Sequence, residues 1–207
     1  MCTSSKTKIH ILQKGYSYED DEGKYHAAAT CTLVLNKNMK IIVDPGGAWQ
    51  KSLILEKLKE HKLQPEDIDL VIGTHGHSDH IGNLNLFPNK KQIIGFDIHT
   101  GDTFELHDFK NGQVYTLLEA ELKVFPTPGH MNHDVSLVVY NSEQYGDVAI
   151  CGDLFECKDD DGIWQEISEN IEVQSKNRNF IANMCDHIVP GHGDIFRNDS
   201  KILPSPK

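Results

Sequence analysis

Residues 74–80, with the sequence THGHSDH, place three histidines and one aspartate within six positions, at His75, His77, Asp79 and His80. Neutral imidazole nitrogen and carboxylate oxygen suit zinc and other borderline divalent ions, whereas an all-oxygen site would suit calcium or magnesium. The apolar run at residues 68–73 predicts a buried strand, and sites on α/β scaffolds are commonly built where such a strand ends. The segment therefore predicts a metal site, with a histidine-rich polar loop as the plainer alternative.

Further ligands are expected from later segments, because four side chains on one short loop cannot all point at one ion. Three segments repeat the order of an apolar strand, a glycine-containing turn and a potential ligand, which is His130, Asp153 or His192. Each glycine allows a sharp turn next to the ligand, although a lone histidine after Pro-Gly is more often a turn residue. The seven candidates together are enough for two metals with positions left open for water.

The remaining patterns predict two groups of strands separated and flanked by helices. We expect strands at residues 8–15, 29–36, 40–43, 68–73, 92–98, 113–126, 135–140, 147–151 and 187–189. Helices are expected at residues 50–61 and, as one or more helices, at residues 164–184. This order fits an α/β fold with four layers, an αββα sandwich. A chain of 207 residues also fits a single domain over residues 1–207.

These motifs resemble those of the metallo-β-lactamase superfamily. THGHSDH matches its HxHxDH signature, and PGH, GD and PGHG follow in the order found in that superfamily. The stretches VDPGG, GTHGHSDHIGNLNLFP, TPGH, GDLFE and VPGHG extend the resemblance from about Ile41 to about Phe196. The resemblance implies a four-layer αββα sandwich of the metallo-β-lactamase type that forms one hydrolase domain.

The resemblance also implies a role for each candidate ligand. His75, His77 and His130 would bind the first metal, Asp79, His80 and His192 the second, and Asp153 would bridge them. Two zinc ions are the expected cofactors, with iron or manganese as alternatives. A hydroxide that bridges the metals would be the nucleophile, since metal-bound water loses its proton near pH 7. Asp79 would in addition have a catalytic role by orienting that hydroxide.

A few other side chains are candidates for supporting roles. Asp44 follows a predicted strand and would either orient a ligand imidazole or cap the DPGG turn. His133 lies three residues after His130, where it would be a catalytic proton donor, a substrate contact or a solvent-facing loop residue. Three residues near the predicted C-terminal helices are candidate substrate or homodimer contacts, although helix packing and solvated charge explain them more simply; they are Trp164, Lys176 and Arg178.

Composition limits the expected partners and compartment. The chain has 31 Asp and Glu against 20 Lys and Arg, a formal net charge of −11, which argues against non-specific binding to polyanions. Its five cysteines lack disulfide-like spacing, and residues 1–10 contain no apolar signal segment. No apolar stretch has the length of a membrane span. We expect a cytoplasmic protein, with the nucleus as a second compartment, that is not secreted and does not enter a membrane.

Several reactions compete for this site. The resemblance to small stand-alone members of the superfamily implies an endoribonuclease that cleaves single-stranded RNA at histone pre-mRNA 3′ ends, and two metals suit in-line displacement at a phosphodiester. A thioester hydrolase similar to glyoxalase II uses the same ligands. A persulfide dioxygenase would hold one iron with His75, His130 and Asp153, and a metal-binding protein without turnover is a further alternative. The full set of seven ligands favours two metals and hydrolysis.

Overall fold

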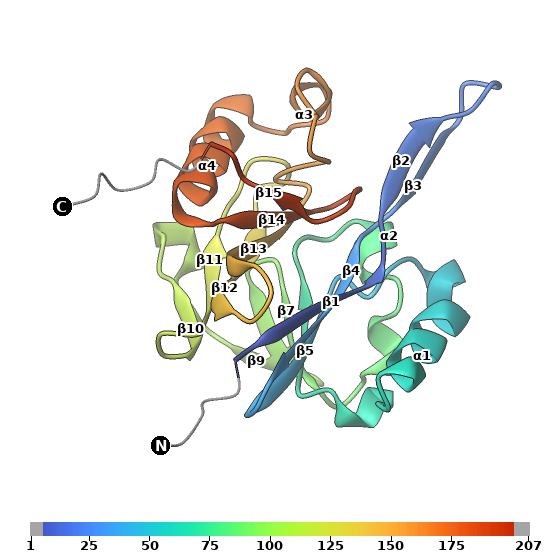
Figure 1. Ribbon diagram of the computed structural model, residues 1–207, viewed down its shortest axis with the longest axis vertical. Helices are drawn as coiled ribbons and strands as arrows, with labels where there is room; N and C mark the ends of the chain where they lie inside the picture. The colour runs from blue at the N-terminus through green and yellow to red at the C-terminus, as the bar shows by residue number, and fades with distance from the viewer. Residues whose placement is uncertain (1–5, 201–207) are drawn as a thin grey trace.

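Two β-sheets form the middle of the molecule in the computed structural model, which describes residues 6–200 (Figure 1). The first sheet has seven strands in the order β1-β4-β5-β6-β7-β8-β9. They are β1 (Lys8–Gln13), β4 (Cys31–Asn36), β5 (Met39–Val43), β6 (Leu70–Gly73), β7 (Lys91–Ile94), β8 (Asp97–Thr100) and β9 (Thr103–Glu105). Because β5, β6 and β7 are parallel, their carboxyl ends lie at one edge of the sheet.

The second sheet has six strands in the order β10-β11-β12-β13-β14-β15. They are β10 (Tyr115–Leu118), β11 (Leu122–Pro126), β12 (Val135–Ser142), β13 (Gly146–Gly152), β14 (His187–Pro190) and β15 (Phe196–Arg197). β12 is antiparallel to both β11 and β13, and β14 is parallel to β13. The strands β11, β13 and β14 therefore share one direction, and their carboxyl ends lie at one edge.

The first sheet buries both of its faces because side chains alternate along each strand. In β5, Ile41 and Val43 enter the core between the two sheets. Ile42 points the other way and packs with Ile54 and Leu58 of α1 (Lys51–Glu60). Full burial of an aliphatic side chain of this size contributes about 1.5–3 kcal/mol.

The second sheet repeats this alternation. Val148 and Ile150 of β13 join the core between the sheets. Ala149 and Cys151 face outward and pack with Ile181 of α4 (Ile171–Met184). α1 and α4 thus cover the two outer faces (Figure 1). This arrangement confirms the predicted αββα sandwich.

The shorter helical elements connect these layers. They are α2 (Ser78–Ile81), α3 (Ile163–Glu166) and the 3-10 turns Ala48–Gln50, Pro65–Asp67, Leu84–Leu86 and Phe109–Asn111. The segment predicted to be helical at residues 164–184 is therefore divided between α3 and α4. Over residues 6–200, no helix has the length and apolar character needed to cross a membrane.

Several predicted strands were wrong in detail because turns interrupt them. The segment 92–98 forms two antiparallel strands, β7 and β8, since Gly95 adopts a positive φ of 53° and reverses the chain. The segment 113–126 is likewise divided into β10 and β11. Between β1 and β4 the chain also forms a separate hairpin of β2 (Tyr16–Glu19) and β3 (Tyr25–Ala28), which extends away from the sandwich (Figure 1).

Candidate metal centre

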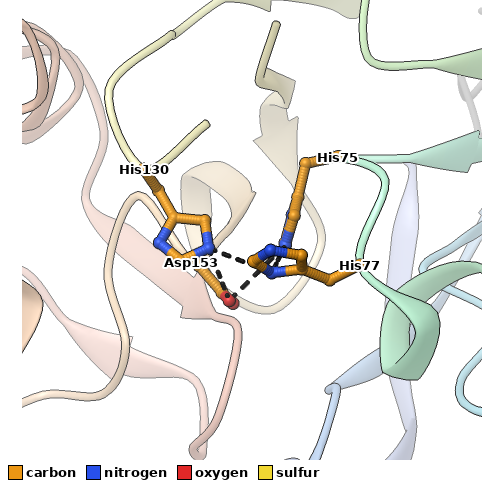
Figure 2. Close-up of side chains that lie close together, drawn as sticks. All are labelled: His75, His77, His130 and Asp153. Carbon is orange, nitrogen blue, oxygen red and sulfur yellow. Dashed lines mark hydrogen bonds and ion pairs between the residues drawn. The ribbon is translucent and has the colours of Figure 1, made fainter. Parts of the chain in front are cut away.

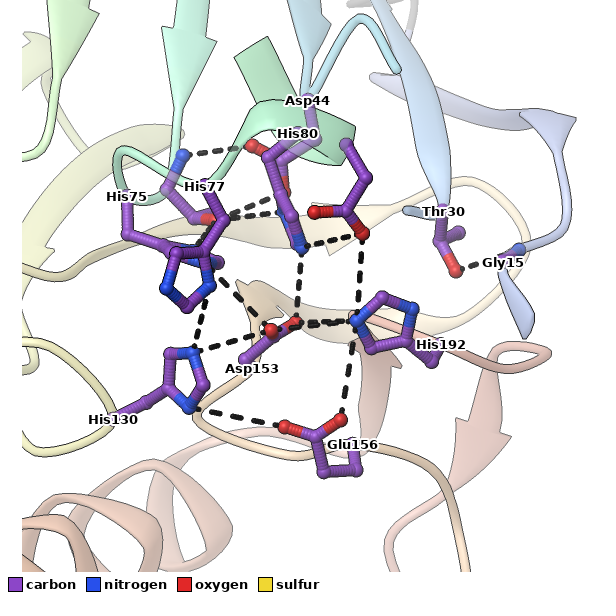
Figure 3. A network of polar contacts seen from close by, with 12 residues as sticks. Gly15, Thr30, Asp44, His75, His77, His80, His130, Asp153, Glu156 and His192 are labelled. Atoms are coloured by element: carbon purple, nitrogen blue, oxygen red, sulfur yellow. Dashed lines mark hydrogen bonds and ion pairs between the residues drawn. The ribbon is translucent and has the colours of Figure 1, made fainter. Parts of the chain in front are cut away.

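The loops after β6, β11, β13 and β14 bring all seven predicted ligands to one place where the two sheets meet (Figure 3). The loop after β6 carries His75 and His77 and continues into α2. A hydrogen bond of 2.9 Å from the Val135 amide to the Thr74 carbonyl ties this loop to the second sheet. The candidate ligands are far apart in the sequence, and they meet because the two sheets pack with the ends of these strands next to one another.

The first cluster consists of three histidines and Asp153 (Figure 2). His77 Nδ1 lies 2.9 Å from His75 Nε2 and 3.2 Å from His130 Nε2. Asp153 Oδ2 lies 3.6 Å from His75 Nε2 and 3.3 Å from His130 Nε2. These four ligand atoms all lie within 4.8 Å of one another. Atoms bound at about 2.0–2.2 Å to one zinc ion lie at comparable separations, so the cluster is a candidate first metal position.

The second cluster lies on the other side of Asp153 (Figure 3). Asp79 Oδ2 is 3.8 Å from His80 Nε2 and 3.8 Å from His192 Nε2. Asp153 Oδ1 is 3.1 Å from His80 Nε2 and 3.3 Å from His192 Nε2. Asp153 thus lies between the clusters, with Oδ1 beside the second cluster and Oδ2 beside the first and also 3.3 Å from His192 Nε2. A carboxylate in this position can reach two cations.

Asp44 and Thr74 fix the proton positions on two ligand imidazoles. Asp44 Oδ2 lies 2.9 Å from His80 Nδ1 and accepts its proton, since a carboxylate has none to donate. The Thr74 hydroxyl also donates to Asp44, at 2.9 Å, and it therefore accepts the Nδ1 proton of His75 at 3.1 Å. In the neutral form of both imidazoles, the lone pair is therefore on Nε2, the atom that faces the clusters. Asp44 therefore contacts the imidazole of a candidate ligand, and its role in orienting a metal ligand stays a prediction.

His192 is oriented by backbone carbonyls. Its Nδ1 lies 3.1 Å from the carbonyl oxygens of both Tyr16 and Ala28, which can only accept a proton. The preceding turn is held by Thr30, whose amide donates to the Gly191 carbonyl at 2.7 Å. In the neutral form of His192, the lone pair is therefore on Nε2, which faces Asp153.

Buried polar atoms without hydrogen-bond partners test whether a cation fits here. Among the described residues, such atoms include Asp79 Oδ2, His80 Nε2 and Asp153 Oδ1. An unpaired buried polar group costs about 1–3 kcal/mol, and native structures rarely contain several together. All three atoms border the second cluster, where one divalent cation would satisfy them at once. Imidazole and carboxylate donors fit zinc, with iron and manganese as alternatives.

The electrostatics of the two clusters follow from burial and from Asp153. Burial, followed by the neighbouring His80, holds the pKa of His75 well below its usual value. Burial also opposes charge on His80, but Asp153 and Asp44 outweigh it and raise the pKa of His80 well above its usual value. For His192, burial is again outweighed by Asp153, which raises the pKa to about 9. Cation binding must therefore displace protons from the second cluster.

Two glycines allow the ligand-bearing turns to pack closely. A methyl group on Gly191 would overlap the Asp153 carboxylate. Gly152 adopts a positive φ of 53°, and a methyl group there would overlap the Thr74 side chain. Close approach, in addition to the sharp turn that was predicted, therefore explains the glycines of the GD and PGHG motifs.

The sequence-based prediction missed two buried polar residues of the site. Thr74 immediately precedes His75 and relays its hydrogen bond to Asp44. Glu156 lies in the loop after β13, between His130 and His192 (Figure 3). Burial, followed by repulsion from Asp153, raises the pKa of Glu156 to about 8. The only signal for Glu156 was its place in the GDLFE stretch.

His133 lies in the wall of a cavity beside the first cluster. This cavity has a volume of about 390 Å³, and its lining includes His75, Asn132 and His133. A neighbouring cavity of about 590 Å³ shares Asn132 and His133 and is lined further by Phe96 and Lys110. The ring of His133 is exposed and packs 4.9 Å from that of Phe96. The catalytic roles of His133 and Asp79 stay predictions.

The three residues proposed as substrate or dimer contacts occupy different environments. Trp164 is buried in α3, and Arg178 of α4 lies over its ring at 4.7 Å. Arg178 also forms an ion pair with the buried Asp160 at 2.6 Å. Lys176 is exposed on α4. Helix packing accounts for Trp164, as the simpler explanation expected, whereas Arg178 forms a largely buried ion pair instead of the expected solvated charge.

Comparisons with known proteins agree with this geometry. The family model for the metallo-beta-lactamase superfamily matches residues 27–192. Metallo-beta-lactamase domain-containing protein 1 of Xenopus laevis is 38% identical over 194 residues, which cover 93% of this chain and 82% of that protein. A hydroxyacylglutathione hydrolase of Aliivibrio fischeri is 33% identical over 128 residues, 58% of this chain and 48% of that protein.

A solved structure has the same fold at lower sequence identity. It comes from Thermotoga maritima and is described as a candidate metallo-beta-lactamase. It superimposes with a TM-score of 0.70 at 23% identity and covers 93% of this chain and 99% of that one. The solved structure shows the shared fold, and the family model and the Xenopus relative show that this chain belongs to the metallo-β-lactamase superfamily of metallo-hydrolases.

Proposed function

We propose that this chain is a hydrolase that uses two divalent metal ions. The observation that carries the proposal is the position of Asp153 between the two clusters of candidate ligands, with Oδ2 beside His130 and Oδ1 beside His80. A single-metal enzyme would need only the first cluster. The second cluster combines the buried His80 with the partly buried Asp79 and His192. It contains Asp79 Oδ2 and His80 Nε2, two of the buried polar atoms that lack hydrogen-bond partners among residues 6–200, which supports a second cation.

The residues around the clusters would position the reactants and move protons. When bound, two cations would supply a nucleophile from water near pH 7 and polarise the substrate oxygen. Asp79, whose Oδ2 would bind the second cation, would use its other carboxylate oxygen to orient the attacking water and accept its proton. His133, in the cavity wall beside His75, would donate a proton to the leaving group.

We further propose that the substrate is single-stranded RNA and that the enzyme is an endoribonuclease. Two metals can hold both the attacking and the leaving oxygen of an in-line phosphodiester displacement. The cavities beside His75 offer the amide of Asn132 and the rings of His133 and Phe96, groups that contact unstacked bases. The net charge of −11 leaves few phosphate contacts, so the affinity should depend only weakly on salt.

Hydrolysis of a glutathione thioester is a second candidate function. Asp97 and Glu169 line the cavity beside His75, where two carboxylates would repel a polyanion but could pair with an ammonium group. The relative from Aliivibrio fischeri is a hydroxyacylglutathione hydrolase. A glutathione thioester is therefore tested as a substrate in the same experiment as RNA.

The test is to incubate the zinc-loaded protein with labelled single-stranded RNA and, separately, with a glutathione thioester. Each reaction runs beside a His77→Ala control, which removes a candidate ligand from the exposed side of the first cluster. We expect cleavage of RNA that is lost in the control. Thioester turnover with intact RNA would instead favour the second candidate, and no metal-dependent turnover of either would indicate a metal-binding protein.

His133→Ala should leave the metal content unchanged and lower turnover by about 100-fold, the lower end of the range for general acid–base groups. The reason is that His133 lines the cavity beside His75 and is absent from both ligand clusters. The measurement is kcat as a function of pH, together with elemental analysis of the variant. Unaltered kinetics with every active substrate would assign His133 to the solvent-facing surface.

A further inference from the structure

Glu156 and His130 face each other across a short gap at the edge of the first cluster (Figure 3). Glu156 Oε1 lies 3.9 Å from His130 Nδ1, and the two side chains are only 6% and 4% exposed. Neither atom has a hydrogen-bond partner within the described residues. An imidazole N–H is a donor and a carboxyl oxygen is an acceptor. A small side-chain rotation would therefore satisfy two buried polar atoms at once.

His130 is the exception among the buried candidate ligands. His80 has Asp44 on its Nδ1, His75 has Thr74, and His192 has two backbone carbonyls. Metal-binding histidines nearly always donate their second ring nitrogen to such a partner, which fixes the tautomer and the ring orientation. For His130, Glu156 Oε1 is the acceptor placed to do the same.

The backbone of Glu156 is fixed on both sides. Its amide donates to Asp160 Oδ2 at 2.9 Å, and its carbonyl accepts the His192 amide at 2.7 Å. Asp160 is in turn held by two hydrogen bonds from Arg178 of α4, at 2.6 and 2.7 Å. The Glu156 side chain therefore starts from a rigid position and needs to adjust only its own rotamer.

We propose that Glu156 accepts the Nδ1 proton of His130 and so positions this imidazole with Nε2 toward the first metal position. The inference rests on the proposed metal centre and is independent of the substrate. Glu156 is thus a positioning residue and would not itself coordinate metal. Glu156, Asp153 and His192 are also close enough to form a ligand group. Glu156 Oε1, however, faces His130 Nδ1, the ring nitrogen that lies away from Asp153.

The test compares Glu156→Gln with Glu156→Leu in the purified protein. Zinc affinity at both positions is measured by competition with a chelator, and the absorption spectrum of the cobalt-substituted protein reports the ligand geometry. Leucine removes the acceptor and should weaken one of the two zinc affinities by about 10–100-fold. Glutamine retains a carbonyl oxygen at the same place and should remain within about threefold of the unsubstituted protein. Glu166→Leu, an exposed position on α3, is the matched control and should change neither affinity.

Each other outcome would overturn the inference. If Glu156→Gln loses as much affinity as Glu156→Leu, the negative charge or direct coordination matters and the positioning role is wrong. If Glu156→Leu binds both zinc ions normally, His130 needs no such partner. Failure of the unsubstituted protein to bind zinc would instead contradict the proposed function.

A measurement on the unsubstituted protein covers the case in which Glu156→Leu does not fold. In the zinc-loaded protein, NMR should detect a slowly exchanging Nδ1–H proton of His130, because a hydrogen bond to a buried carboxyl protects it from solvent. This signal should persist in Glu156→Gln. A His130 ring proton that exchanges as fast as that of an exposed imidazole would contradict the inference.

Discussion

Replacing Asp153 with asparagine is expected to remove metal from both positions and to abolish hydrolysis. Asp153 is the one candidate ligand with an oxygen near each cluster, at 3.3 Å from His130 Nε2 and 3.1 Å from His80 Nε2. The amide would replace one oxygen with an NH₂ group, which cannot bind a cation, and would remove the negative charge that separates two cations. Because metals supply several kcal/mol of transition-state stabilisation, activity should fall by about 10⁴-fold or more.

Elemental analysis of the purified proteins is the direct measurement. The unsubstituted chain should contain close to two metal ions, most of them zinc, whereas Asp153→Asn should contain almost none. His77→Ala is the comparison, since it removes a ligand of the first cluster only and should retain the second ion. Unchanged metal content in Asp153→Asn would show that the bridge is misassigned. One tightly held iron in the unsubstituted protein would favour the dioxygenase alternative.

Arg178→Met is expected to lower the free energy of unfolding by about 3 kcal/mol. The variant leaves the Asp160 carboxylate, only 2% exposed, without its cation, and breaking a buried ion pair from one side costs about 3–5 kcal/mol. Because Arg178 is itself 14% exposed, we expect a loss of unfolding free energy at the lower end of this range. Methionine retains much of the contact with the rings of Phe155 and Trp164, so the loss reports mainly the ion pair and its hydrogen bonds.

Urea denaturation at one fixed concentration of free zinc measures this difference. Lys14→Met breaks an exposed pair with Asp194, whose side chains are 60% and 67% exposed, and should cost less than about 1 kcal/mol. Adding Asp160→Asn to Arg178→Met should recover part of the loss, because the unpaired charge is removed. A loss below 1 kcal/mol in Arg178→Met would show that this ion pair contributes no more than a surface pair.

The sequence was informative wherever a feature depends on neighbouring residues. The apolar runs before His75, Asp153 and His192 form β6, β13 and β14, because a buried strand needs a continuous apolar segment whatever it packs against. The prediction failed at turns such as Gly95, where one residue with positive φ turns an apparent single strand into a hairpin. The ligand roles of the seven side chains stay predictions, although the structure brings all seven together.

Contacts between distant segments were decided only by the tertiary structure. Asp44 contacts His80 because β5 pairs with β6. The Tyr16 carbonyl contacts His192 because the β2-β3 hairpin lies against the loop after β14. Apart from its place in the GDLFE stretch, nothing in the sequence distinguished Glu156 from a surface glutamate, and only the fold buries it beside His130. The sequence by itself determined which strands end in potential ligands, since that depends on local order. Which nitrogen of each imidazole is free depends on partners that only the packing of the two sheets supplies.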